Sequence, residues 1–147
     1  MLKCGSHQTH GLVAHRSDRY QQGDIDVIIA GMAITPQRAL QLNFTLPYAE
    51  SGVGLATNTK MTEGIKDLRE LNRPQIIVAA AAKTLGSDVA KLVFDDADLR
   101  ILATGAEAEQ AVLDGKAHAY VGGLVETTFL SLQHPDKVDT PLSKPLL

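Results

Sequence analysis

The segment GMAITPQR, residues 31–38, combines residue types that could bind an anion. Gly31 lets a ligand approach the backbone closely, Thr35 is a favourable N-cap residue, and Pro36 suits the first position of a helix because its missing N–H costs nothing there. Arg38 would lie in the first helical turn, where a guanidinium is unfavourable without an anion and could bind one carboxylate together with unpaired backbone amides. The alternative is a capped surface helix with a solvated arginine.

A second set of residues near the N-terminus could ligate a metal: Cys4, His7, His10 and His15. Their spacing matches no standard zinc pattern. The first 22 residues are polar and show no sustained hydrophobic periodicity, so they predict an N-terminal arm (residues 1–22) with at most a short helix at its end. The sequence also contains no obvious pair of nucleophile and base. It therefore predicts no metal, no cofactor and no catalytic residue.

Length and charge limit the possible functions. The 147 residues, of which 44% are hydrophobic and 21% charged, suffice for one domain with a core or for one domain and part of another. The net charge of -3 and the lack of a basic stripe argue against nucleic-acid binding. No apolar run is long enough for a membrane span, and the first ten residues do not resemble a signal peptide. As written, the chain is expected to stay in the cytosol unless its true start is missing, so its location stays open.

Short elements are expected around the anion-binding segment. Residues 24–30, DIDVIIA, are apolar and β-branched, which predicts a parallel strand buried on both faces. A helix is expected from Pro36 to about Leu42, followed by FTLPY (residues 44–48), whose proline favours an edge or crossing strand. Because a doubly buried strand needs neighbours and the chain offers few upstream, a second copy of the chain is expected to cover it.

From residue 51 onward, strands and helices are expected to alternate with short links. The expected strands span residues 51–57, 75–81, 99–103 and 117–121, and the expected helices span residues 62–71, 86–94, 104–113 and 125–133. Thr104 and Glu107 form a capping-box pattern, and Gly115 suits a helix C-terminus. Such alternation is typical of a mainly parallel α/β layer.

The stretch GDIDVIIAGMAITPQRALQLNFTLPYAESG, residues 23–52, resembles the central signature of type II periplasmic solute-binding proteins of the amino-acid class, which serve ABC transporters. IKDL (65–68), AVLDGKAHAYV (111–121) and HPDKVDTPLSKPLL (134–147) match the same family in order and spacing. The resemblance implies an α/β fold of the periplasmic binding protein type II, with a three-layer parallel-sheet lobe. It divides the chain into a remnant of lobe I with hinge-crossing strands and a lobe II, truncated at both ends; these span residues 23–57 and 58–147.

In this family, two lobes close on a ligand and crossing strands act as the hinge. The resemblance implies that Arg38 binds the carboxylate of the ligand and that Gly31 offers its backbone. Ala33 stands where a hydroxyl side chain is common. One contact of the usual set is therefore missing from the first lobe.

The resemblance places the second-lobe contacts at Lys83 and Thr84, and an acid for the ligand ammonium at position 123. Lys83 replaces the usual glycine, and Gly123 removes that acid. Either Glu126, the nearest acid, binds the ammonium, or the ligand has no free amine. In the second case Arg38 and Lys83 favour a mono- or dicarboxylate. Lys83 could also be a solvated surface lysine.

Three functions remain open at this stage. The first is binding of an amino acid or related carboxylate, as by the substrate-binding component of an ABC transporter, periplasmic by resemblance and partnered by a permease if exported. The second is a truncated, oligomeric relative, at least a homodimer with possibly exchanged strands, whose binding role is lost or regulatory. The third is an enzyme on the same scaffold, as in the cyclohexadienyl dehydratase branch, with Glu126, Glu50 or His118 as the acid. The sequence favours a binding protein over an enzyme.

Overall fold

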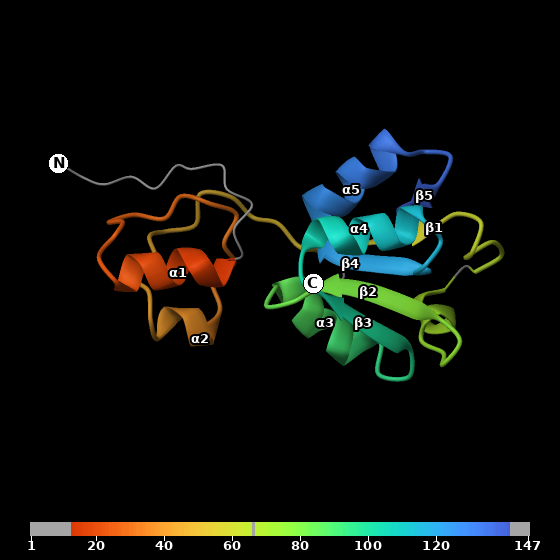
Figure 1. Cartoon of the computed structure of the whole chain (residues 1–147), viewed down its shortest axis with the longest axis horizontal. Helices are drawn as coiled ribbons and strands as arrows, with labels where there is room; N and C mark the ends of the chain where they lie inside the picture. The colour runs from red at the N-terminus through yellow and green to blue at the C-terminus, as the bar shows by residue number, and fades with distance from the viewer. Residues whose placement is uncertain (1–12, 66, 142–147) are drawn as a thin grey trace. The chain divides into compact units, whose positions relative to one another are not determined.

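The computed structural model describes residues 13–65 and 67–141, which divide into two compact units at residues 50 and 51 (Figure 1). The first unit contains helices α1 (Val13–Gln21) and α2 (Pro36–Ala39). Helix α1 is the short helix expected at the end of the N-terminal arm. No helix in the described part of the chain has the length and apolar character needed to cross a bilayer.

Helix α2 begins as the sequence predicts. Thr35 is its N-cap, and Pro36 occupies the first turn. The helix is shorter than predicted, because it ends at Ala39 instead of continuing to about Leu42. The backbone N–H of Leu40 donates to the carbonyls of Pro36 and Arg38, which closes the helix after a single turn.

The predicted strand at residues 24–30 is wrong. Only Val27 makes an isolated bridge, and the side chains of Val27 and Ile29 are 40% and 71% exposed. An apolar, β-branched run favours extended backbone, but it forms a strand only where a neighbouring strand accepts its hydrogen bonds. Residues 44–48 form no strand either; the hydroxyl of Tyr48 instead donates to the carbonyl of Ala30 at 2.7 Å.

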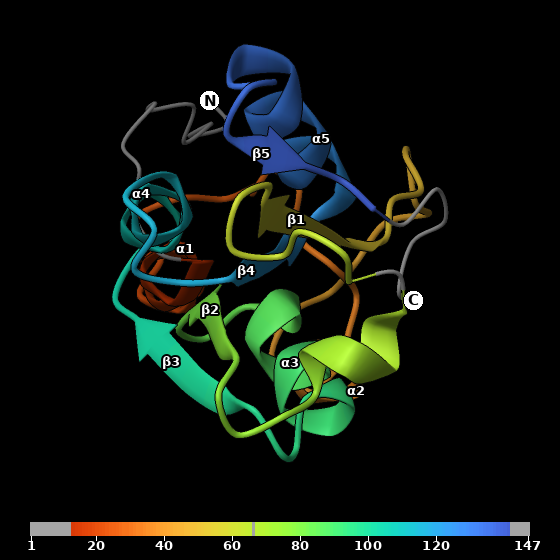
Figure 2. The same cartoon turned by 90° about the vertical axis from the view of Figure 1, so that its right-hand side faces the viewer.

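The second unit is a five-stranded mixed sheet in the order β3-β2-β4-β1-β5, which the labels follow from lower left to top in Figure 2. Its strands are β1 (Val53–Asn58), β2 (Ile77–Ala81), β3 (Asp98–Leu102), β4 (Ala119–Gly123) and β5 (Val138–Asp139). β2 pairs in parallel with β3 and β4, whereas β1 pairs antiparallel with β4 and β5. The expected parallel sheet is thus confined to its three-strand part.

Helices cover both faces of this sheet, which gives the predicted three layers. The helices are α3 (Leu85–Val93), α4 (Gly105–Leu113) and α5 (Leu124–Gln133). α3 packs on one face over Val78, Ala80 and Val121, while α4 and α5 cover the other face (Figure 1). Residues with opposite parity in each strand thus supply two separate core layers.

The helix predicted over residues 62–71 is largely absent. The chain forms turns at residues 59–64 and then the 3-10 helix η1 (Leu68–Leu71). The side chain of Asn58 accepts hydrogen bonds from the amides of Lys60 and Met61, and Gly64 has a φ of 83°, a left-handed conformation that a helix cannot continue through. Turn chemistry therefore overrides the hydrophobic spacing here.

Candidate ligand-binding site

The side chain of Arg38 folds back over its own loop. Its Nη1 donates to the carbonyl of Ala33 at 2.9 Å, and its backbone N–H donates to Thr35 Oγ1 at 3.3 Å. A guanidinium has five N–H donors, and this is the only acceptor that the described residues give it. The remaining donors of a half-buried arginine are available to an anion.

Gly31 lies in open space. A Cβ atom added at this position would meet nothing within 4 Å, and its φ is not in the left-handed region. The described part of the first unit therefore does not require glycine here. Ala33 has no polar side-chain atom, as its type dictates, and contributes only its carbonyl, which Arg38 occupies.

In the second unit, three predicted site residues lie together at one edge of the sheet. β2 and β4 are parallel neighbours, so their carboxyl ends meet at the same edge, which we call the carboxyl edge. Lys83 and Thr84 follow β2, and Glu126 lies in the first turn of the helix that follows β4. β3 flanks β2 on its other side, so the edge is a topological switch point, the usual place for ligands in open α/β sheets.

Thr84 is the N-cap of α3. Its Oγ1 accepts from the N–H of Ser87 at 3.2 Å and donates to the carbonyl of Ala81 at 2.7 Å. Ser87 completes a capping box by accepting from the N–H of Thr84. The threonine hydroxyl hydrogen is thus already used by the fold.

Lys83 is exposed and has a φ of 59°. A left-handed conformation favours glycine, so a lysine here is strained. No ion pair involves Lys83 among the described residues. The exposure of Lys83 is therefore explained equally well by a solvated surface lysine that makes no contact with a ligand.

Glu126 is held at the start of α5. Its Oε2 accepts from the backbone N–H of Gly123 at 3.1 Å and from the hydroxyl of Tyr120 at 3.4 Å. Burial raises the pKa of nearby Glu109 on α4, and the negative charge of Glu126 raises it further. Burial, with both carboxylates adding to it, also raises the pKa of Tyr120, so the tyrosine stays a hydrogen-bond donor.

Sequence reasoning missed Tyr120 and Glu109. Both lie within expected elements, Glu109 in the helix over residues 104–113 and Tyr120 in the strand over residues 117–121, but only the packing of α4 and α5 on one sheet face brings them near Glu126. The alternation in the strand was the available signal, because Tyr120 and Gly122 share a face and the glycine leaves room for the ring.

The other candidate acids do not join this group. His118 lies at the opposite end of β4, where its Nδ1 accepts from the N–H of Ile77 at 3.0 Å, and burial lowers its pKa. Glu50 is exposed at the end of the first unit. The described residues contain no cluster that could hold a metal ion; Cys4, His7 and His10 lie outside them, as does the side chain of His15.

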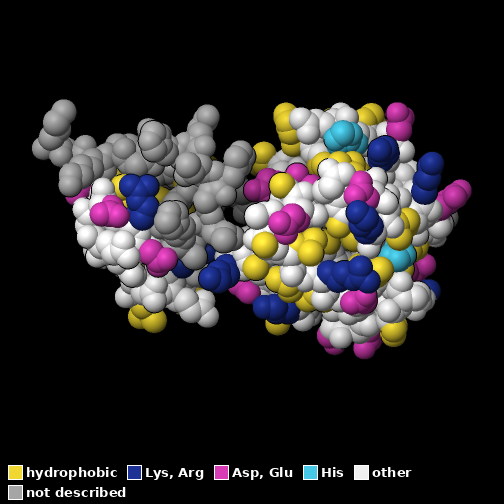
Figure 3. Space-filling model, viewed as in Figure 1, with side chains coloured by type: hydrophobic (Ala, Val, Ile, Leu, Met, Phe, Trp, Pro, Cys, Tyr) yellow, Lys and Arg dark blue, Asp and Glu magenta, His cyan; other side chains and the backbone are white. Residues whose placement is uncertain are grey.

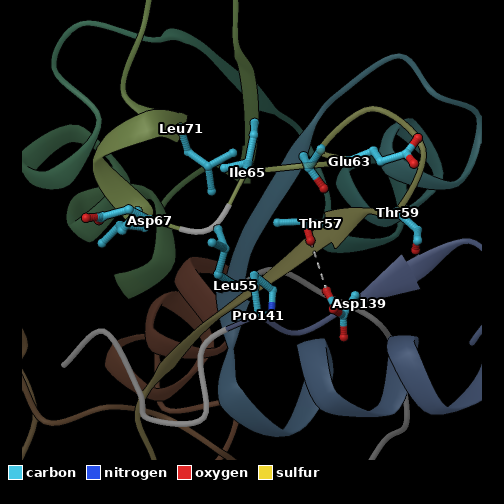
Figure 4. Close-up of a pocket in the computed structure, with 11 residues that line it drawn as sticks. Leu55, Thr57, Thr59, Glu63, Ile65, Asp67, Leu71, Asp139 and Pro141 are labelled. Carbon is cyan, nitrogen blue, oxygen red and sulfur yellow. Dashed lines mark hydrogen bonds between the residues drawn. The ribbon is translucent and has the colours of Figure 1, made fainter.

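A cavity of about 250 Å³ lies elsewhere in the second unit (Figure 4). Its lining includes the apolar side chains of Leu55, Ile65 and Leu71 and also Thr57, whose hydroxyl donates to the carbonyl of Asp139 at 3.3 Å. None of the six predicted site residues lines it. Geometry therefore separates this cavity from the carboxyl edge.

Charges of both signs are interspersed on the face of the second unit shown in Figure 3. Asp98 pairs with Arg100 and Asp114 with Lys116, both at the surface. Neither a basic stripe nor a single-sign field covers the face in view. This distribution agrees with the net charge of -3, which gives no reason to expect nucleic acid.

Comparison with known proteins decides the family. Residues 12–114 match the model of the bacterial extracellular solute-binding proteins, family 3. The chain belongs to this family. A curated relative, "Probable amino-acid-binding protein YxeM" of Bacillus subtilis (strain 168), is 29% identical over 123 residues, which are 83% of this chain and 44% of the relative.

Similar solved structures agree with the fold. A protein from Wolinella succinogenes DSM 1740, described as a binding component of an ABC transporter and complexed with lysine, matches with a TM-score of 0.84 and 27% identity, over 93% of this chain and 59% of that chain. An ancestral amino acid-binding protein, described as a precursor of cyclohexadienyl dehydratase, matches with a TM-score of 0.72 and 30% identity, over 78% of this chain and 51% of that chain. The type II periplasmic binding protein fold is confirmed, and the chain spans about half the length of the relatives it matches.

Proposed function

We propose that this chain binds a small amino acid or a related carboxylate and performs no chemistry on it. In this proposal Arg38 and the backbone around Gly31 bind the carboxylate of the ligand. Thr84 and Glu126, with Lys83 beside them, supply contacts from the carboxyl edge of the second unit. Family membership and the similar structure that is complexed with lysine support an amino acid as the ligand.

The state of Arg38 is the observation that carries this proposal. Its guanidinium gives one N–H to Ala33 and keeps its other donors without a protein acceptor in the described residues. Gly31, two residues before Ala33, is a glycine that the described fold does not need. A planar cation beside open backbone suits bidentate binding of a carboxylate.

Titration calorimetry tests the proposal with L-lysine, L-arginine, L-glutamine, L-glutamate and a panel of organic acids. Arg38→Ala is expected to weaken the tightest interaction about 10- to 100-fold, since a charge-assisted hydrogen bond is worth about 1.5–3 kcal/mol. Arg73→Ala, which removes an exposed arginine from the second unit, is the matched control and should leave binding unchanged. No heat from any panel member, or equal affinity of Arg38→Ala and the unchanged chain, contradicts the proposal.

An enzymatic role has less support. The curated relative and the lysine-bound structure are binding proteins, although one similar ancestral protein is described as a precursor of a dehydratase. Of the three candidate acids, His118 accepts a hydrogen bond from the backbone N–H of Ile77 through its Nδ1, and Glu50 is exposed. Only Glu126 remains at a ligand-binding edge, and an acid alone is insufficient for elimination without a positioned base.

The homodimer and the permease stay predictions. Exposed apolar side chains in the first unit favour association, with Ile29, Leu40 and Leu46 being 71%, 87% and 89% exposed. Light scattering coupled to gel filtration should give at least twice the 15.7 kDa of one chain. A mass of one chain over the concentration range used for binding would remove the reason to propose exchanged strands.

A further inference from the structure

Tyr120 is buried in a position that directs its hydroxyl to the carboxyl edge. The residue is 2% exposed and packs in the core layer under α4 and α5. A Cβ atom on Gly122 would come within 2.4 Å of the tyrosine hydroxyl, and one on Gly105 within 3.5 Å. The ring therefore extends along its own strand, over Gly122, to the first residue of α4.

The hydroxyl of Tyr120 meets Glu126 at this edge. Oε2 of Glu126 accepts from Tyr120 at 3.4 Å and from the N–H of Gly123 at 3.1 Å. No donor among the described residues binds Oε1. Two donors on a single oxygen orient the carboxylate, and its second oxygen keeps its capacity to accept a hydrogen bond from a ligand.

The carboxylates of this edge have no ion-pair partner among the described residues, although the exposed Lys83 follows β2 at the same edge. The ion pairs among the described residues are Arg19 with Asp24, Arg100 with Asp98 on β3, and Lys116 with Asp114 after α4. None of them includes Glu126 or Glu109. Burial, and after it the negative charge of Glu126, raises the pKa of Glu109, so two like charges lie near each other here without an ion-pair partner among the described residues. A ligand that carries an ammonium group would supply a positive charge here.

We infer that Tyr120 is a positioning residue, whose hydroxyl orients Glu126 to bind the α-ammonium of an amino acid. The inference rests on the proposed function and narrows its ligand from carboxylates in general to those with a free α-amino group. Glu126 thereby replaces the acid that Gly123 lacks, three residues further along the chain. The selectivity for ligands with an α-ammonium group is thus increased by the hydrogen bond from Tyr120 to Glu126, although Tyr120 itself does not contact the ligand.

The test compares L-lysine with 6-aminohexanoate, which is lysine without its α-amino group. Tyr120→Phe keeps the ring and should weaken lysine binding about fivefold, as expected for one hydrogen bond of about 1 kcal/mol, and should change 6-aminohexanoate binding by less than about twofold. Glu126→Gln should weaken lysine binding more strongly, and Tyr120→Phe should have no additional effect on top of it. Tyr20→Phe, which removes a tyrosine hydroxyl from the first unit, is the control.

If Tyr120 has only a structural role, Tyr120→Phe should weaken the binding of L-lysine and of 6-aminohexanoate equally, and that result overturns the inference. Unchanged lysine binding in Tyr120→Phe overturns it as well. If the unchanged chain binds neither probe, the proposed function and the ligand class fail together. The positioning is then judged without ligand: the amide proton of Gly123, which shares Oε2, should shift in the NMR spectrum of Tyr120→Phe, and an unmoved signal contradicts positioning.

Discussion

The two units of this chain differ in what covers their apolar side chains. In the second unit, Val78, Ala80 and Val121 are completely buried between the sheet and its helices. In the first unit, Leu46 and Tyr48 are 89% and 73% exposed, and order comes from local hydrogen bonds such as the cap on α2. The second unit thus owes its structure to its own core, whereas the described part of the first unit buries only Ile25 and Leu42 among its apolar side chains and depends more on turns and caps, which give little stability.

Truncating a core residue should produce the largest contrast between the units. Phe94, 1% exposed, ends α3 inside the core layer beneath it. Phe94→Ala should lower the free energy of unfolding by about 3–5 kcal/mol, through lost burial and the cavity left behind. Leu46→Ala, the matched control, should change it by less than about 0.5 kcal/mol. Urea denaturation measures both, and similar costs would erase the distinction between the units.

Adding a methyl group to a glycine should produce the next largest difference in stability between the two units. A Cβ on Gly86 would lie 2.7 Å from the carbonyl oxygen of Val121, a backbone atom that cannot move aside, so Gly86→Ala should cost about 1–3 kcal/mol. Gly31→Ala adds the same group in open space and should leave thermal stability unchanged. Loss of amino-acid binding in Gly31→Ala, at unchanged stability, would indicate that the ligand contacts the backbone at this glycine. A clear drop in its melting temperature would contradict the open surroundings of Gly31.

A strained lysine gives a smaller effect of opposite sign. Lys83→Gly removes the cost of a left-handed backbone at a φ of 59° and should stabilise the second unit by about 1 kcal/mol. Lys116→Gly is a control at an exposed lysine whose φ is not positive, and it should not stabilise. Calorimetric melting of both variants decides the point. A destabilised Lys83→Gly would mean that the lysine side chain contributes more than its backbone costs.

The smallest expected effect is a dependence of stability on pH. Burial lowers the pKa of His118 in the folded chain, so folding favours the neutral imidazole that accepts from Ile77. Its contribution is complete above the unfolded pKa of about 6.5 and is lost as pH falls through the lower folded value. His118→Gln should flatten the decline in stability below about pH 6.5, whereas His134→Gln should leave it in place. Identical pH profiles for all three chains would contradict this role.

The second unit could be predicted from its sequence because local and tertiary signals agree there. Thr104 caps α4 through the N–H of Glu107, and Gly115 follows its end with a φ of 69°, both as expected. The capping box is incomplete, because the side chain of Glu107 accepts from the N–H of Ala103 and not from that of Thr104. Parallel pairing around β2 followed from the alternation of strands and helices. The antiparallel pairing of β1 could not be deduced, because the direction in which a strand enters a sheet depends on the chain before it.

The first unit could not be predicted in the same way. The run DIDVIIA has the composition of a buried strand, but strand formation depends on a partner that periodicity within the run does not reveal. At the site, the cap and the arginine of α2 were readable from residue types. The link from Tyr120 to Glu126 was not, because it joins a strand to the next helix through a side-chain hydrogen bond.

Hydrogen exchange of the whole chain, with and without L-lysine, tests the central claim most directly. Without ligand, amides of β2 and β4 should exchange slowest, and those of residues 31–35 should exchange near the rate of an unstructured peptide. With saturating L-lysine, protection should rise at residues 31–38 and at the first turns of α3 and α5, and remain unchanged in β3. Equal protection of both units before ligand is added, or no change at these segments after it, would contradict the account.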